Sequence, residues 1–448
     1  MTIADKLKQI KQSTDAIKAS ATALTGEVQT DLTSIAIILD TANPANATDI
    51  LNMLGYTSTN APDLYNAFLN SLNKEEGASY TNDTSVLLPK LTVDANGVYT
   101  GKMYMFKGST ILTVPKGKYR VLNGLSPAYN EMFSGCTSLL WVPDLELLGT
   151  NMYNTYSCSK MFQSCSSLRT VGNLNMKGCT DAFNMFQGCA NLESIKALDT
   201  SDVTNMESMF NFCLKLVDVP QLDTSKVTTM RMMFRDCQSL VNIPQLDTSK
   251  VTNMSYIFQN CNNLKSIPQW DFRAATDLNY GFSGCSLLTE TPDLNLDSVT
   301  NVSSLFYGDS ALVTIGALNT PKVTNITYML QNCPSIEKIT SLDVRAVTNN
   351  SYITGFSGTI KPLKYMLLKN LGQSTATSWG LSSFPNWGVN DDKYPDARQS
   401  LIDTLITYSY DRASAGMSTC TIKLDSKTKA LLTEDEIAQI TAKGFTIS

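Results

Sequence analysis

The chain has 448 residues, enough for two or three domains, and its 35 lysines and arginines against 40 aspartates and glutamates give a formal net charge of −5. No long run of one sign interrupts this balance, which argues against nucleic acid or an anionic membrane as a partner, because both would require a basic stripe. The sequence has no histidine, the usual general base near neutral pH and the commonest metal ligand. We therefore expect a protein that is not an enzyme and binds no cofactor.

Residues 1–40 carry a heptad pattern. Apolar residues recur in alternating steps of four and three from Ile3 to Leu39, with Thr14 and Ala21 as the weaker positions. This spacing predicts an N-terminal helix with a coiled-coil seam, and the alternative is an amphipathic helix packed on its own domain. The candidate oligomerisation and anchor residues are Ile3, Leu7, Ile10, Ile17, Leu24 and Val28. The segment lacks the apolar core of a signal peptide, and no stretch is long enough to span a membrane, so we expect no membrane insertion.

Two segments precede the repeats. Residues 41–90 are rich in asparagine, threonine and serine and are punctuated by Asn43-Pro44 and Ala61-Pro62, which predicts a linker or a small helical domain. Residues 91–120 alternate like strands around glycine and aspartate turns. We interpret this second segment as cap strands that shield the first coil of the following array from water.

Residues 121–360 are organised as a tandem repeat. Three gapless copies of a 24-residue unit run from Leu198 to Gln269. The aromatic residue of an M-F-x-x-C box recurs every 24 residues from Phe162 to the equivalent Leu330, and only the step from Phe133 to Phe162 is longer, at 29. Such fixed-period self-similarity predicts a solenoid, and the longer step predicts a five-residue insertion in one coil.

Each repeat unit contains two patterns. In the copy of residues 222–245, the apolar residues between Val227 and Phe234 are spaced by three and four, which predicts a short helix. Residues 240–243 then alternate like a strand and are closed by Pro244. A helix and a strand in every coil predict an α/β leucine-rich-repeat solenoid, whose coils must stack to bury a continuous core.

At the level of sequence, the string LDTSKVTNMSYIFQNCNNLKSIP of residues 246–268 resembles the BspA-like leucine-rich repeat of bacterial and mycoplasmal surface proteins. The resemblance extends from Val121 to Val347, about half of the chain. It implies a right-handed solenoid used for adhesion or recognition. It implies no catalytic residue, because no such residue defines the family.

The cysteines follow the repeat. Eight of the eleven occupy one repeat position, three residues after the aromatic, and Asp309 interrupts the series. Equivalent positions in stacked coils form a ladder with rungs roughly 5 Å apart. We expect reduced cysteines packed in the core, and pairing of adjacent rungs is the alternative. The ladder consists of Cys136, Cys165, Cys189, Cys213, Cys237, Cys261, Cys285 and Cys333.

Residues 361–448 lose the 24-residue period but continue to alternate between helix and strand. We predict a helix over residues 396–408, a strand over residues 421–424, a helix opened by the capping box of Thr433 and Glu436, and a final strand over residues 445–447. We interpret the segment as irregular repeats that form an α/β C-terminal cap. Trp379 and Trp387 either pack inside this cap or form a contact surface.

Two rows of side chains are candidate binding surfaces. The first row faces outward from the predicted strands, on the predicted concave side, and includes Asp218, Asn242, Lys265 and Glu290. The second row shares one position of the predicted helices and consists of Tyr256, Tyr280, Tyr328 and Tyr352, interrupted by Ser304. Tyrosine offers a large contact area at low entropic cost and is enriched in binding faces. The alternative is that the tyrosines are half-buried between neighbouring coils.

Acidic and amide side chains suggest two further sites, both of which we disfavour. Aspartate or asparagine recurs at one turn position from Asn175 to Asp343. Capping of each residue's own turn explains this ladder without metal, whereas calcium requires several oxygens converging on each ion. Carboxylate pairs such as Asp144 with Glu146, or Asp391 with Asp392, have the chemistry of a glycosidase, but the sequence places neither in a cleft.

The resemblance to surface proteins, the expected absence of an export signal and the predicted coiled coil together favour a bacteriophage virion protein made in the host cytoplasm. We expect a tail or head fibre, with a trimer favoured by that context, whose N-terminus binds other virion proteins and whose solenoid binds a host-surface protein or glycan. One alternative is a structural virion component that binds other virion proteins. The others are a bacterial surface adhesin and a polysaccharide depolymerase that uses carboxylates.

Overall fold

The computed structural model describes residues 92–102, 104, 106–109, 114, 117–123, 126–127, 129–149, 155–267, 269–350, 363–381 and 387–448. The predicted coiled coil of residues 1–40, the segment of residues 41–90 and Tyr352 lie outside the described residues. The chain divides into two compact units. The first comprises Met1–Cys179 and Cys189–Asp199, and the second comprises Thr180–Gly188 and Thr200–Ser448.

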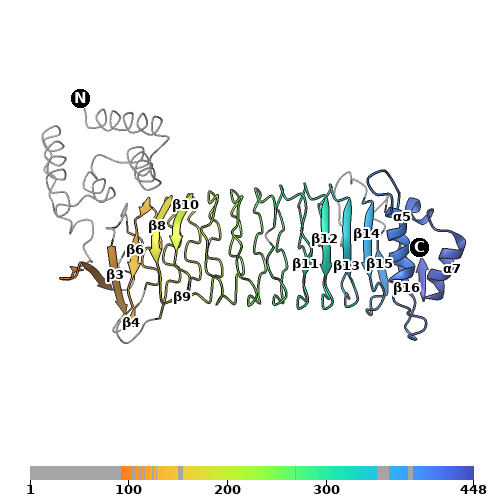
Figure 1. The fold of residues 1–448 in the computed structure, drawn as a ribbon, viewed down its shortest axis with the longest axis horizontal. Helices are drawn as coiled ribbons and strands as arrows, with labels where there is room; N and C mark the ends of the chain where they lie inside the picture. The colour runs from red at the N-terminus through yellow and green to blue at the C-terminus, as the bar shows by residue number, and fades with distance from the viewer. Residues whose placement is uncertain are drawn as a thin grey trace, which may run out of the picture. The chain divides into compact units, whose positions relative to one another are not determined.

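The first unit is built on a sheet whose strands follow the order β1-β2-β3-β6-β8-β10, with β4 paired to β3 and β5 to β8. Figure 1 shows β3, β6, β8 and β10 side by side in this order. From β2 onward along this order the neighbouring strands are parallel, because each coil repeats the direction of the one before it. The strands of this sheet are β1 (Thr92–Val93), β2 (Val98–Lys102), β3 (Gly117–Asn123), β4 (Ser126–Pro127), β5 (Trp141–Val142), β6 (Leu145–Leu147), β8 (Thr170–Asn175) and β10 (Ser194–Leu198). The short strands β7 (Tyr156–Ser157) and β9 (Cys179–Asp181) lie outside it.

The predicted insertion is confirmed by the strand register of the first unit. Trp141 pairs with Thr170, an offset of 29 residues, whereas Thr170 pairs with Ser194, an offset of 24. Leu145 and Leu174 keep the offset of 29. The extra residues therefore follow β6, outside the paired strands, and leave the ladder of backbone hydrogen bonds intact.

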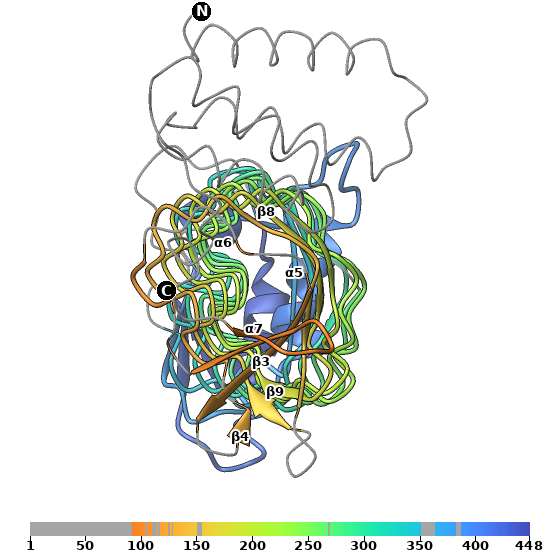
Figure 2. The same ribbon diagram turned by 90° about the vertical axis from the view of Figure 1, so that its left-hand side faces the viewer.

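In the second unit, successive coils pair through parallel β-bridges 24 residues apart. One such row runs through Asp181, Asn205, Thr229 and Asn253 and continues to Asn349. Longer strands form the sheet β11-β12-β13-β14, which comprises β11 (Leu294–Asn295), β12 (Thr314–Asn319), β13 (Lys338–Asp343) and β14 (Tyr365–Lys369). Viewed end-on in Figure 2, the green coils of this unit superimpose, as a constant register requires. The unit is therefore a β-solenoid, and the predicted strand of each coil is confirmed at β12 and β13.

The helix predicted in each coil is wrong. Residues 155–267 and 269–350 contain no helix in the structure. The apolar stretch from Met230 to Cys237 forms consecutive turns, in which Met233 and Cys237 donate backbone hydrogen bonds to the carbonyls of Met230 and Phe234. The intervening amides of Met232 and Phe234 donate instead to the next coil. Met232 has a φ of 56°, which ends any right-handed helix, and the repeat is therefore all-β rather than α/β.

The core of each unit contains a column of aromatic rings from the M-F-x-x-C boxes. In the second unit, Phe210 and Phe234 stack with their ring centroids 5.7 Å apart, and Phe234 and Phe258 with theirs 5.5 Å apart. In the first unit, Phe133 and Phe162 stack at 5.1 Å. These rings are fully buried, so each coil stabilises the next mainly through apolar contact.

All eleven cysteines are buried and none of them forms a disulfide, so the structure supports reduced cysteines in the core rather than paired rungs. Within the ladder, each thiol donates to the carbonyl of an aromatic residue in the preceding coil, as Cys237 does to Phe210 at 3.1 Å and Cys165 does to Phe133 at 3.1 Å. Burial raises the pKa of the Cys237 thiol, which therefore stays protonated. The cysteines are hydrogen-bonding core residues rather than nucleophiles.

Residues 363–448 combine helices and strands as predicted. The expected helix appears as α5 (Ala397–Ile402), continued by the π-helix η2 (Asp403–Thr407), and the capping box of Thr433 and Glu436 opens α7 (Glu434–Ala442). The remaining elements are β15 (Ser378–Gly380), β16 (Cys420–Lys423), α6 (Ser426–Lys429) and β17 (Phe445–Ile447). Trp379 and Trp387 are fully buried, and the indole of Trp387 donates to the Met366 carbonyl at 3.1 Å, so both tryptophans pack internally.

Candidate functional site: an aromatic and arginine stack

The tyrosine row lies on the first turn after each β-bridge of the second unit. In the coil of Tyr256, the Ile257 amide donates to the Met254 carbonyl at 3.2 Å, and Tyr256 is the third residue of this turn. The Tyr256 amide donates to the Asn279 carbonyl of the next coil at 2.9 Å. The backbone at this position is therefore fixed both by its own turn and by the neighbouring coil.

This turn position requires left-handed backbone. The φ angles of Tyr256, Tyr280 and Tyr328 are 58°, 53° and 57°. A left-handed conformation costs an L-residue about 1–2 kcal/mol, and turns of this kind favour glycine or asparagine at the third residue. Tyrosine is therefore an unfavourable choice for the turn itself, and its recurrence must be explained by what its side chain contacts.

The Tyr256 ring is covered on both faces. The Tyr280 ring from the following coil stacks on it, with centroids 5.0 Å apart and planes 4° from parallel. From the preceding coil, the guanidinium carbons of Arg231 and Arg235 lie 5.9 and 6.0 Å from its centroid. Cations over an aromatic face are attracted by the negative charge of the ring face.

The two arginines extend the cluster. Arg235 also lies over the Phe212 ring at 5.7 Å, and Phe212 is 43% exposed, which makes it one of the most exposed apolar side chains described. Arg231 is held by an ion pair with Glu207 at 2.8 Å, and Arg235 lies 3.2 Å from Asp236. We call Phe212, Arg231, Arg235, Tyr256 and Tyr280 the aromatic–arginine stack. The charges of its two arginines are balanced by the neighbouring carboxylates of Glu207 and Asp236.

The remaining members of the tyrosine row lie further along. Tyr328 is exposed, and Tyr352 lies outside the described residues. Ser304, at the same position one coil before Tyr328, is left-handed and buried. Tyr307, also exposed, accepts a hydrogen bond from the Asn332 amide at 3.2 Å. Tyr256 and Tyr280 themselves are half-buried, as the alternative interpretation of the row expected, whereas Tyr307 and Tyr328 are exposed.

The other candidate surface, the row of side chains on the predicted strands, is exposed. Asp218 and Asn242 form a β-bridge, and the Asn242 amide donates to the Asp218 carboxylate at 2.9 Å. Glu290 bridges to Thr314, and Lys265 is exposed. The row is a ladder of polar side chains that partly satisfy each other, and it has fewer aromatic contact groups than the aromatic–arginine stack.

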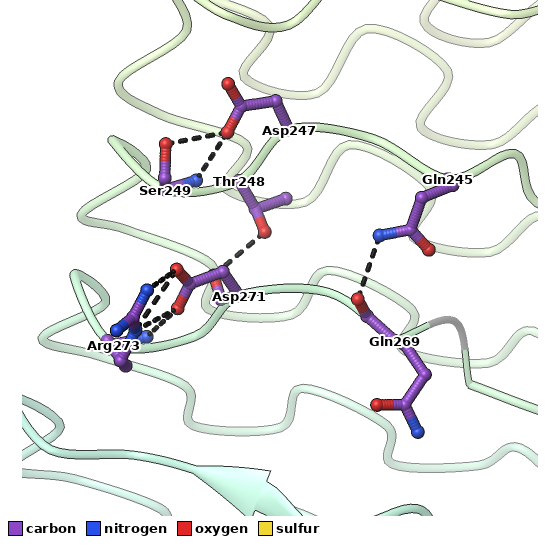
Figure 3. Close-up of polar contacts among 7 residues, drawn as sticks. All are labelled: Gln245, Asp247, Thr248, Ser249, Gln269, Asp271 and Arg273. Carbon is purple, nitrogen blue, oxygen red and sulfur yellow. Dashed lines mark hydrogen bonds and ion pairs between the residues drawn. The ribbon is translucent and has the colours of Figure 1, made fainter.

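The ladder of aspartates caps its own turns (Figure 3). The Asp247 carboxylate accepts hydrogen bonds from the Ser249 amide and hydroxyl, at 3.0 and 2.6 Å, and Asp271 forms an ion pair with Arg273 at 2.7 Å. These hydrogen bonds, led by that of the Ser249 hydroxyl, lower the pKa of Asp247. One coil's Thr248 hydroxyl donates to the backbone carbonyl of Asp271 in the next, at 2.8 Å. The side chains are thus engaged as turn caps, as the sequence predicted.

The carboxylate pairs have structural partners. Asp144 accepts a hydrogen bond from the Asn173 amide at 2.7 Å, and Asp391 forms an ion pair with Lys364 at 3.0 Å. Over the described residues, no group of three or more cysteines, aspartates or glutamates is arranged to hold a metal ion.

Sequence reasoning missed Phe212, Arg231 and Arg235. Aligning the repeats could have indicated the two arginines. Arg231 and Arg235 lie on either side of Met232, which is equivalent to Tyr256 in the next repeat. Their relevance depends on the order in which coils stack, since each arginine reaches the ring of the coil that follows. The helix interpretation hid this relationship by assigning the same residues to the side of a helix.

Comparisons with known proteins agree with the repeat pattern. Residues 156–266, 180–294 and 256–360 match the family described as "Mycoplasma protein of unknown function, DUF285". This match supports the resemblance of the repeats to the BspA-like leucine-rich repeat. No curated protein matches the chain.

Among solved structures, the leucine-rich repeat protein of T. pallidum (TpLRR) is similar at 18% sequence identity, covering 51% of this chain and 82% of that one. The TM-score of this match is 0.23. Separately, none of the helices in the described ranges has the length and apolarity needed to cross a bilayer.

Proposed function

We propose that this chain is a non-enzymatic recognition protein, the part of a bacteriophage tail or head fibre that binds a protein or glycan on the host surface. The aromatic–arginine stack carries the proposal. Tyr256 and Tyr280 occupy turn positions at which tyrosine is conformationally costly, and they lie beside two arginines and an exposed phenylalanine. Tyrosine and arginine are the residues most enriched among those that dominate binding energy.

The rigidity of the stack favours recognition. Each of its turns is hydrogen-bonded to the next coil, and Arg231 is held by Glu207, so few rotamers are lost when a partner binds. Because the rings stack on one another and both residues are half-buried, we expect them to offer their edges and hydroxyls to a partner. A protein or a hydroxyl-rich glycan provides matching polar groups.

The heptad pattern of residues 1–40 supports the fibre assignment. An oligomerising segment followed by a display solenoid is the arrangement of a fibre, with the N-terminus bound to other virion proteins and a trimer as the favoured state. In an oligomer, several weak contacts of separate solenoids combine into tight attachment. The proposed location is accordingly the virion.

Binding of the purified full-length protein to a panel of bacterial cells tests the proposal. We expect saturable binding that Tyr256→Asn with Tyr280→Asn reduces at least tenfold, because asparagine tolerates left-handed backbone and removes only the rings. The matched control is Lys160→Asn, which changes a left-handed residue far from the stack in the sequence. Binding that survives the double substitution unchanged excludes the stack. A protein that ignores every cell but binds virion proteins is instead a structural component of the particle.

A further inference from the structure

The cysteine ladder of the second unit has one interruption, and the hydrogen bonds around it define its consequence. In the neighbouring rungs, the Cys261 thiol donates to the Phe234 carbonyl at 3.0 Å and the Cys285 thiol to the Phe258 carbonyl at 3.3 Å. After the interruption the pattern resumes, with Cys333 donating to Phe306 at 2.8 Å. On either side of the interruption, the aromatic carbonyl thus receives a thiol donor from the coil that follows.

Asp309 occupies the interrupted rung. Its side chain is fully buried, and its Oδ1 accepts a hydrogen bond from the Cys285 amide at 2.8 Å. Its Oδ2 is buried and has no hydrogen-bond partner among the described residues. The carbonyl that lacks a thiol donor is that of Phe282, which accepts only from the Cys285 amide, at 3.2 Å, among the hydrogen bonds of the described residues.

We propose that Asp309 carries a proton on Oδ2 in the folded protein and donates it to the Phe282 carbonyl, in place of the missing thiol. Asp309 occupies the ladder position at which each cysteine rung presents a thiol donor. A carboxylate there would put an unpaired negative charge beside carbonyl lone pairs in the core, which is far more costly than a neutral acid. The contact between the coils of Cys285 and Asp309 therefore depends on one proton.

The groups that face Asp309 would not offset the negative charge of its ionised carboxylate. The preceding and following coils present the thiols of Cys285 and Cys333, which burial keeps neutral. Burial also raises the pKa of Asp309 well above its usual value, opposed only by the amides of Cys285 and Gly284. Within the described part of the chain, no lysine or arginine forms an ion pair with it.

The sign of the pH dependence follows from linkage. Between the unfolded pKa of aspartate, about 4, and the raised folded pKa, the folded state holds a proton that the unfolded state has lost. Stability from this site is complete below about pH 4 and decreases as the pH rises. The opening equilibrium of these coils should therefore increase about tenfold for each pH unit in this window.

Hydrogen exchange of the backbone amides of residues 285–312, followed against pH in the full-length protein and corrected for intrinsic exchange, tests the proposal. We expect protection to fall with rising pH in the native sequence. In Asp309→Asn, whose amide accepts and donates as the neutral acid does, this dependence should vanish. Asp309→Cys restores the ladder and should behave in the same way. Asp392→Asn, a matched change of an exposed aspartate, should retain the native dependence.

An identical pH dependence in the native protein and in both Asp309 variants would overturn the proposal. A second measurement needs no variant that folds, because the infrared band of a protonated carboxyl is visible in the native protein. We expect that band at about pH 6, where ordinary aspartates are ionised. Its absence at that pH means that Asp309 is a buried carboxylate, and the proposal then fails.

Discussion

The rings of Tyr256 and Tyr280 lie parallel and 5.0 Å apart, although both residues hold a backbone conformation that favours glycine. Stacking of the two rings must offset at least part of the cost of this backbone conformation. Offset-stacked aromatic pairs contribute about 0.5–1.5 kcal/mol beyond their buried area, which is comparable to the cost of one left-handed residue.

A double-mutant cycle on Tyr256 and Tyr280 measures the coupling energy between the two rings. With Tyr256→Asn, Tyr280→Asn and the double variant, we expect a coupling energy of about 0.5–1.5 kcal/mol in urea denaturation, because the two rings contact each other directly. The cycle of Tyr256 with Tyr328, two coils further apart, is the control and should give a coupling close to zero. Additive effects in the first cycle would show that the stack does not stabilise the solenoid, which would leave recognition as its sole role.

The buried thiols predict a labelling pattern. All eleven cysteines are buried, and burial raises the pKa of Cys237, Cys261 and Cys285, so little thiolate is available to react. We expect an aromatic disulfide reagent to label none of them within minutes in the native protein and all eleven in denaturant. Rapid labelling of any ladder cysteine without denaturant would mean that the coils open locally.

Arg412 should be essential to the C-terminal region. Its guanidinium is buried and donates to the backbone carbonyls of Gly372, Ser374 and Ser418 at 2.6, 2.9 and 2.9 Å. Arg412→Met keeps much of the volume but leaves these carbonyls without their donors, so we expect a loss of about 2–4 kcal/mol in thermal or urea unfolding. Arg273→Met, which removes an exposed arginine, should change stability by less than about 0.5 kcal/mol. Equal effects of the two substitutions would contradict this assignment.

The aspartate turns predict a loss of stability in acid. Hydrogen bonds from Ser225 and Ser249 lower the pKa of Asp223 and Asp247 below the value in the unfolded chain. A group whose folded pKa is lowered stabilises the folded state above its unfolded pKa, and that contribution is lost as the pH falls below about 4. Ser249→Ala should weaken this acid sensitivity, measured as the change of the urea midpoint with pH. An unchanged profile would show that the turn hydrogen bonds do not depend on the charge of Asp247.

Acid and base should therefore act on different parts of one coil stack. The turn aspartates lose their contribution as protons are added, whereas Asp309 is proposed to lose its contribution as its proton is removed. Because each coil contacts only its neighbours, these effects remain local and are separable by residue-resolved exchange.

The sequence by itself determined everything that depends on period. The 24-residue spacing predicted stacked coils with a continuous core, and the shared position of the cysteines predicted their burial. The capping box of Thr433 and Glu436 predicted α7, because capping is a contact between residues close in the chain. Local pattern and repeat length suffice for features of this kind.

Tertiary structure alone decided what the backbone amides bond to. The spacing of Met230 and Phe234 satisfies a helix, but the Met232 and Phe234 amides donate to the next coil, and Met232 takes a left-handed φ to allow it. For the same reason, Arg235 meets the Tyr256 ring, which lies one coil further along the chain. Hydrogen bonds between coils outweigh the local helical preference, since a solenoid coil satisfies its amides only through the coils on either side.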